Sequence, residues 1–272
     1  MMSDSAISDQ FRMATLERIA RYTVGIAVER NTGVGTGTLV SVGGERFVLT
    51  AAHVIGESKP TDIRFWLRPP APIKEKAAAD TKNDEIGGFT LGVQLPISDI
   101  WIDRSADIAA MKLDPSFILP VGVDLYNVLG SREFMSWEDS KLDGLSLVLF
   151  GFPVENSREV FAQGNRSFRY LGCASHLSKY SVELNSSVWP KLSSKHSQSR
   201  DFAFNYDDLN PHGFSGGGVW VLGHDPKKMV WRPDPILVGV VHDYVRRLGI
   251  LIATKLPAFI EAHVVPPGAP NI

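Results

Sequence analysis

Three short runs of the sequence carry side chains that together could perform acyl transfer. His53 ends a Thr-Ala-Ala-His run, Asp107 opens the apolar run 107–113, and Ser215 lies in a Gly-Phe-Ser-Gly-Gly run. A serine hydroxyl becomes an effective nucleophile only when a neighbouring imidazole removes its proton. The imidazole in turn needs a carboxylate that fixes its tautomer and stabilises its positive charge. The order His, Asp, Ser therefore predicts nucleophilic hydrolysis, with His53 as general base and then acid.

Asp103 is the competing carboxylate. It stands beside Arg104, in a context typical of an exposed turn. Asp107 instead begins an apolar strand, where a partly buried charge needs a partner. Because His53 would be that partner, we expect Asp107 to orient the imidazole.

Taken together, the three runs resemble the motifs of the trypsin-like serine peptidases, the chymotrypsin-fold group that has many bacterial members. The resemblance covers residues 20–262, nearly the whole chain. It implies a serine endopeptidase that hydrolyses peptide bonds through an acyl-enzyme, with an oxyanion hole formed by the amides of Gly213 and Ser215. Phe214 stands where trypsin has an aspartate that pairs with a newly cut N-terminus, so that activation route is not expected here.

The resemblance also implies a specificity pocket lined by five residues: Leu209, Asn210, His242, Asp243 and Tyr244. Trypsin has an aspartate at the position of Leu209, so cleavage after lysine or arginine is not implied. Tyr244 replaces a glycine that commonly leaves the pocket open, which indicates a restricted pocket. His242 could contact an acidic substrate side chain and Asp243 a basic one, and this choice stays open.

The elements that must position these residues are mostly strands. Short β-rich runs bounded by turn residues are typical of an all-β fold. They are residues 22–29, 34–42, 46–50, 62–67, 107–113, 145–152, 167–174, 202–206, 217–222, 236–243 and 248–254. Gly43 and Gly44 predict a hairpin between the second and third of these runs.

Two helices are expected at the ends of the strand-rich region. Residues 9–20 predict an amphipathic helix with Phe11, Leu16 and Ile19 on one face. Residues 255–264 predict a closing helix with Pro257 in its first turn. The stretches 68–88 and 184–200 are polar and are expected to form surface loops.

The family resemblance supplies the domain organisation. It implies a single peptidase domain over residues 1–272, made of two six-stranded antiparallel β-barrels. The first barrel, residues 20–130, would carry His53 and Asp107. The second, residues 131–262, would carry Ser215, the oxyanion hole and the specificity pocket.

The run around Ser215 also matches Gly-x-Ser-x-Gly, the nucleophile elbow of α/β-hydrolases, and Asp234 and His263 follow in that family's order. Two features oppose this alternative. The glycine-rich stretch after Ser215 is a poor helix start and a fair strand. The strand runs are also not interleaved with helical patterns, as a parallel sheet would require.

Composition limits the partners and the compartment. The 272 residues have a net charge of −2, which gives no electrostatic case for nucleic acid or an acidic membrane. Cys173 is the single cysteine, so no intrachain disulfide is possible. The N-terminus lacks the pattern of a signal peptide and no apolar run reaches 18 residues, so we expect a cytoplasmic protein. No Cys/His cluster has metal-ligand spacing, and we expect neither metal nor cofactor.

Two functions remain open from the sequence. One is an active endopeptidase acting on peptide or protein substrates. The other is a catalytically silent or latent peptidase scaffold that binds peptides or a partner. Since residues 216–218 are all glycine, we expect a flexible run that lets the oxyanion hole exist in two states. We expect the loops 68–88 and 184–200 to order only with a substrate or a regulatory protein partner, and activity on generic unfolded substrates to be weak.

Overall fold

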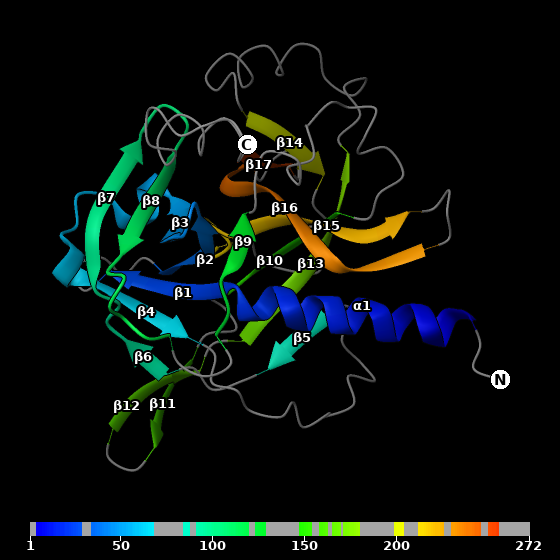
Figure 1. Ribbon diagram of the computed structural model, residues 1–272, viewed down its shortest axis with the longest axis horizontal. Helices are drawn as coiled ribbons and strands as arrows, with labels where there is room; N and C mark the ends of the chain where they lie inside the picture. Colours follow the sequence, from blue (N-terminus) through cyan, green and yellow to red (C-terminus); the bar gives the residue numbers. More distant parts are fainter. Residues whose placement is uncertain are drawn as a thin grey trace.

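Two curled β-sheets carry the candidate residues, one in each half of the chain (Figure 1). In the computed structural model, the described residues are 4–28, 34–67, 84–87, 91–119, 123–128, 147–153, 158–162, 165–169, 171–179, 199–203, 212–225, 230–245 and 250–255. The fold is predominantly β with antiparallel pairing, as the sequence predicted.

The first sheet runs in the order β6-β4-β1-β2-β3-β8-β7, and β9 pairs in parallel with β2. Its strands are β1 (Thr23–Val28), β2 (Val34–Val42), β3 (Glu45–Ala51), β4 (Ile63–Leu67), β6 (Leu91–Val93), β7 (Ile97–Asp103), β8 (Ile108–Leu113) and β9 (Tyr126–Val128). The barrel expected for this half of the chain is a curled, mostly antiparallel sheet. It has eight strands, one of them parallel, and no strand pairing among the described residues joins its ends at β6 and β7.

The second sheet closes on itself. Its order is β10-β15-β16-β17-β14-β13, and β13 pairs again with β10, which gives the expected six-stranded barrel. The strands are β10 (Leu147–Gly151), β13 (Leu171–Lys179), β14 (Ser199–Ala203), β15 (Gly218–Asp225), β16 (Val230–Val245) and β17 (Ile250–Lys255). A separate hairpin of β11 (Arg158–Ala162) and β12 (Asn165–Arg169) projects from the body of the molecule (Figure 1).

One strand crosses from the first half of the chain to the second barrel. Residues 84–87, expected to be part of a surface loop, form β5 (Asp84–Gly87), which pairs with β13. The register places Gly87 opposite Leu171. The sequence missed this strand because its polar, charged composition is not typical of β-structure.

The N-terminal helix α1 (Asp4–Arg21) begins earlier than the sequence predicted. Leu16 and Ile19 are fully buried, as expected, whereas Phe11 is exposed. The sequence predicted that a closing helix begins at Lys255, but Lys255 is the last residue of β17. The rest of that prediction, residues 256–264, lies outside the described residues. Neither described helix has the length and apolar character needed to cross a membrane.

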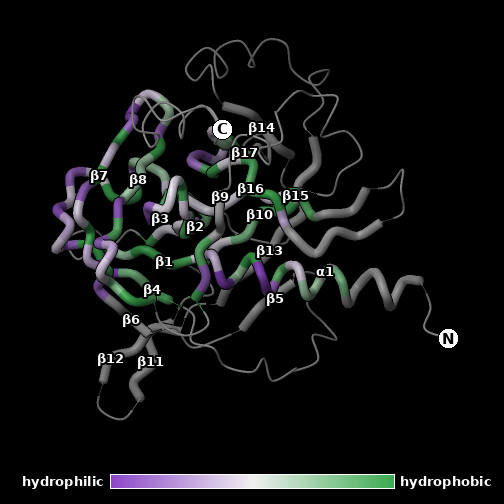
Figure 2. The backbone as a smooth tube through the Cα atoms, in the orientation of Figure 1, coloured by the Kyte–Doolittle hydropathy of each residue, from purple (hydrophilic) through white to green (hydrophobic). Residues whose placement is uncertain are grey.

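Three hydrophobic clusters explain how the sheets pack. One lies within the first sheet around Ile26, Phe65 and Met111. A second lies within the barrel around Phe214 and Val238. The third joins α1 to both sheets, with Leu16, Phe47 and Trp220 among its members. Apolar residues accordingly follow the inner strands in Figure 2. This third cluster holds the two halves together, so residues on facing edges can form one site.

Candidate active site

His53 lies in a one-turn helix, α2 (Ala52–Ile55), which directly follows β3. The neighbouring Ala52, Val54 and Ile55 are buried and anchor the turn. Gly56 ends it in a left-handed conformation with φ 55°. The short helix therefore holds its backbone against the sheet while the His53 side chain remains 49% exposed.

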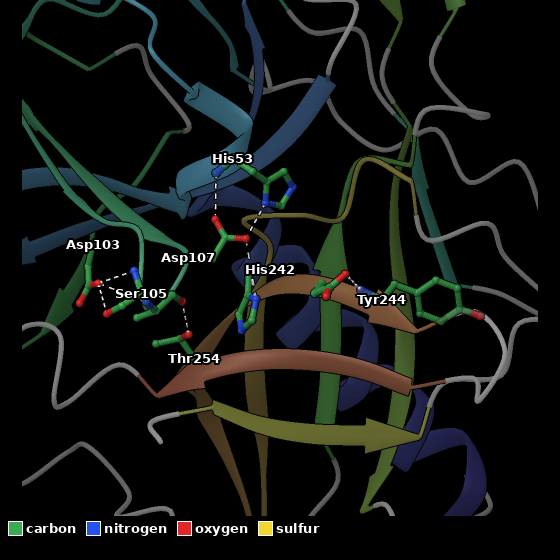
Figure 3. A network of polar contacts seen from close by, with 9 residues as sticks. His53, Asp103, Ser105, Asp107, His242, Tyr244 and Thr254 are labelled. Carbon is green, nitrogen blue, oxygen red and sulfur yellow. Dashed lines mark hydrogen bonds and ion pairs between the residues drawn. The ribbon is translucent and has the colours of Figure 1, made fainter. Parts of the chain in front are cut away.

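Asp107 ends the turn that leads into β8, and β3–β8 pairing brings it beside α2. The Ala52 amide donates to the Asp107 carbonyl at 3.1 Å. The His53 amide donates to Oδ1 of Asp107 at 2.9 Å, and Nδ1 of His53 lies 2.7 Å from Oδ2 (Figure 3). An ionised carboxylate only accepts, so Nδ1 carries a proton and Nε2 is left to accept one. The pair thus has the tautomer that a general base requires.

The backbone of Asp107 is left-handed, with φ 47°, the one non-glycine residue with positive φ among those described. Aspartate and asparagine tolerate this region better than other side chains. The residue before it is also held from the second barrel, because Thr254 Oγ1 donates to the Ala106 carbonyl at 2.6 Å. Both halves of the chain therefore fix the position of this carboxylate.

The two side chains shift each other's protonation. The hydrogen bond to Asp107 raises the pKa of His53 against the effect of partial burial, with further contributions from the charges of Asp107 and Asp243. Burial alone would raise the pKa of Asp107, but its hydrogen bonds to His53 and the charges of His53 and His242 outweigh it and lower that pKa. The ion pair is therefore favoured in the folded protein.

Asp103, the competing carboxylate, has a different role. Its Oδ1 accepts hydrogen bonds from the amide and hydroxyl of Ser105 and from the amide of Ala106. It caps the turn that precedes Asp107, as expected for a turn residue. Figure 3 shows Asp103 on the far side of this turn from His53.

Ser215 lies in a turn that is hydrogen-bonded to both sheets. The amide of Thr36 in β2 donates to the Ser215 carbonyl at 2.8 Å. The Gly216 amide donates to the carbonyl of Val241 in β16 at 2.6 Å. The Phe214 side chain, between Gly213 and Ser215, is fully buried in the barrel. Apolar packing of Phe214 therefore anchors the turn that carries Ser215.

Close approach, rather than flexibility, explains the glycines after Ser215. Gly216 has φ 87°, and a Cβ there would lie 1.9 Å from the Thr36 carbonyl oxygen. A Cβ on Gly217 would lie 2.7 Å from the Phe150 carbonyl oxygen, and Gly218 has already entered β15. These contacts do not support the expectation that residues 216–218 form a flexible run.

Two amides in this turn are available as donors. Gly213 has φ 97°, and among the described residues nothing accepts a hydrogen bond from its amide or from that of Ser215. Within the same described ranges, no hydrogen bond joins the His53 imidazole to the Ser215 hydroxyl. Such contacts are often long before substrate binds. The two amides and the Ser215 side chain thus lie in one turn, without a hydrogen bond to His53 among the described residues.

The expected pocket residues fall in three different settings. His242 is 3% exposed, and its Nδ1 lies 3.8 Å from Oδ2 of Asp107. Its imidazole therefore lies beside the carboxylate in the protein interior. Asp243 is exposed and Tyr244 is partly buried, both at the end of β16. Leu209 and Asn210 lie outside the described residues.

Sequence reasoning missed Thr36 and Thr254, which tie the site segments across the two sheets. Each stands in an apolar strand run and carries no motif. The only sequence signal for Thr36 is its place between Gly35 and Gly37. Within the described ranges, no group of three or more His, Cys, Asp or Glu residues could hold a metal.

Neither a family model nor a curated protein matches the sequence. Solved structures match in fold. The scabies mite inactivated protease paralogues S-D1 and S-I1 are 13% and 14% identical, with TM-scores of 0.54 and 0.53, over 92% and 90% of this chain and 91% and 93% of theirs. The secreted serine protease VesC from Vibrio cholerae is 16% identical, with a TM-score of 0.47, over 88% of this chain and 44% of that one.

The likeness to the two inactivated paralogues establishes the fold and no more. The chain has the fold of the trypsin-like serine proteases, as its motifs predicted. Whether it cleaves peptides depends on the chemistry of its own residues.

Proposed function

We propose that the chain is a serine endopeptidase in which Ser215 is the nucleophile, His53 the general base and Asp107 the orienting carboxylate. The observation that carries this proposal is that both carboxylate oxygens of Asp107 contact His53. Oδ1 lies 2.9 Å from the His53 amide nitrogen, and Oδ2 lies 2.7 Å from Nδ1. A structural histidine–aspartate contact would not require a half-exposed imidazole and a serine turn held beside β16.

The reaction follows from these positions. The Ser215 hydroxyl adds to the carbonyl carbon of the scissile peptide while Nε2 of His53 takes its proton. The carbonyl oxygen becomes an oxyanion, which the amides of Gly213 and Ser215 would stabilise. Collapse expels the amine, which takes the proton from His53. Water then hydrolyses the acyl-enzyme by the same two steps and returns Ser215 to its free form.

Labelling by a fluorophosphonate tests this proposal. The reagent phosphonylates only an activated serine at an appreciable rate, so the parent protein should gain one adduct, located on Ser215 by mass spectrometry. Ser215→Ala and His53→Ala should not be labelled. Thermal unfolding should be nearly unchanged in Ser215→Ala, because a single hydroxyl contributes little packing.

The second candidate is a silent scaffold that binds peptides. Two protein structures of the same fold are described as inactivated protease paralogues, and in this chain no hydrogen bond joins His53 and Ser215 within the described residues. This candidate predicts no adduct on Ser215. The labelling experiment therefore separates the two functions without knowledge of the substrate.

A further inference from the structure

Thr36 is a buried residue of β2 whose polar atoms are all hydrogen-bonded. Its amide donates to the Ser215 carbonyl at 2.8 Å, and its carbonyl accepts from Thr50 Oγ1 at 2.7 Å. Its hydroxyl oxygen lies 2.6 Å from the Gly213 carbonyl and 3.0 Å from the Phe152 amide. The side chain is completely buried. One residue of the first sheet therefore contacts both the nucleophile turn and the end of β10.

The direction of these hydrogen bonds follows from the groups involved. The Phe152 amide can only donate, so the Thr36 oxygen accepts from it. The Gly213 carbonyl can only accept, so the single hydroxyl proton of Thr36 points to it. Each backbone group is thereby satisfied by the one side chain, in a place that excludes water.

Thr36 holds the nucleophile turn at two points, the carbonyls of Gly213 and Ser215. The Gly213 carbonyl belongs to the 213–214 peptide and the Ser215 carbonyl to the 215–216 peptide. Because peptide units are planar, fixing these two oxygens fixes two planes that flank the 214–215 peptide, which carries the Ser215 amide. The Gly213 amide belongs to the preceding peptide, which joins the fixed 213–214 plane at the Gly213 Cα. Loss of the hydrogen bond to the Gly213 carbonyl would release the 213–214 peptide and so loosen both neighbouring peptides that carry the donors.

We propose that Thr36 is a positioning residue for oxyanion stabilisation, and this inference rests on the proposed peptidase function. Its hydroxyl keeps the Gly213 carbonyl turned toward the first sheet, so that the Gly213 and Ser215 amides stay aimed at the developing negative charge. The role belongs to the transition state, because the amides meet a full charge only there.

The sequence offers a matched pair of variants. Thr36→Val removes the hydroxyl with little change in shape and leaves the Gly213 carbonyl and the Phe152 amide without their partner. Thr38→Val makes the same change two residues along β2, at a fully buried threonine whose hydroxyl has no hydrogen-bond partner among the described residues. Thr36→Ser keeps the hydroxyl and should restore the behaviour of the parent.

Amide hydrogen exchange tests the contact itself, independently of activity. Exchange at Phe152 should become faster in Thr36→Val and stay slow in Thr36→Ser and Thr38→Val, at a temperature where all variants are folded. If Thr36→Val does not fold, the contact can be tested on the parent protein. A Thr36 hydroxyl proton donated to Gly213 gives a slowly exchanging NMR signal, and the absence of that signal would overturn the proposal.

Kinetics and an oxyanion signal test the positioning role. Thr36→Val should lower kcat by about 10- to 100-fold with little change in KM, a smaller loss than removal of a whole oxyanion-hole donor. A tetrahedral adduct with a ¹³C-labelled peptidyl chloromethyl ketone should show a higher oxyanion pKa in Thr36→Val than in Thr36→Ser. Equal kcat and equal oxyanion pKa in Thr36→Val and Thr38→Val would overturn the inference.

The two proposals fail in different ways. A parent protein that does not react with the fluorophosphonate overturns the peptidase function, and the positioning role with it, whatever the exchange at Phe152. A parent that reacts, together with a Thr36→Val variant that matches Thr38→Val, overturns the positioning role alone.

Discussion

The His242 imidazole lies 3.8 Å from the Asp107 carboxylate, on the side away from His53 (Figure 3). The carboxylate thus stands between two imidazoles, one half exposed and one buried. The charge of His242 is also among the causes that lower the pKa of Asp107.

Replacing His242 by glutamine should therefore raise the pKa of Asp107 toward its ordinary value. The titration can be followed by ¹³C NMR of the Asp107 carboxyl carbon in an inactive Ser215→Ala background. If the Asp107 pKa did not change, His242 would be a packing residue without electrostatic influence on the site.

The pH dependence of activity should report the raised pKa of His53. The general base must be neutral, so kcat/KM should rise with pH along a limb centred above about 6.5, the ordinary value for histidine. Asp243 contributes to this shift. Asp243→Asn should move the limb to lower pH with kcat at high pH nearly unchanged. A limb that stayed in place would mean that Asp243 is screened by solvent.

Asp107→Asn should lower kcat by about 10⁴-fold, because the amide no longer selects the tautomer with a free Nε2. The fold should survive, since asparagine also tolerates a left-handed backbone. Single-turnover kinetics of the folded variant measure this loss of activity. A variant with nearly full activity would remove Asp107 from the proposed mechanism.

The same variant should lose stability in a defined pH window. Asp107 has a lowered pKa, so its contribution is lost as pH falls through that value. His53 has a raised pKa, so its contribution is lost as pH rises through it. The free energy of unfolding should therefore differ most between parent and Asp107→Asn from about pH 4 to 6.5. Urea unfolding at a series of pH values measures this difference in the free energy of unfolding. A difference between parent and variant that grew toward high pH would contradict the prediction.

Gly216→Ala should disrupt the nucleophile turn. The left-handed backbone costs about 1–2 kcal/mol for alanine, and the clash of its Cβ with Thr36 and Thr50 adds about 1–3 kcal/mol of overpacking. Gly43→Ala is the control, since Gly43 is also left-handed, with φ 58°, but a Cβ there meets nothing within 4 Å. Gly216→Ala should therefore unfold at a lower temperature than Gly43→Ala and should be labelled more slowly by the fluorophosphonate.

The sequence predicted much of the site because its motifs are local. The Ala-Ala-His turn, the residue before β8 and the glycine-rich turn each fix one side chain over a few residues. The Gly43–Gly44 hairpin was predicted for the same reason, and both glycines have positive φ. Asp107 could be chosen over Asp103 because burial requires a partner for a charge.

Long-range contacts could not be predicted in this way. Thr36 meets Gly213 across 177 residues, and Thr254 meets Ala106 across 148. A threonine in a strand gives no sign of which distant backbone group its hydroxyl will meet. The proximity of His242 to Asp107 was also not predicted, because position alone does not tell which face of β16 a side chain occupies near a register shift.

The pairing of β5 with β13 bears on how the protein is made. Residues 84–87 leave the ribosome well before residue 171, opposite which Gly87 finally lies. Synthesis of the first half therefore yields a segment whose hydrogen-bonding partner does not yet exist, and closure of so large a loop slows folding. The short strand β5 can therefore pair only after the second half of the chain has been synthesised.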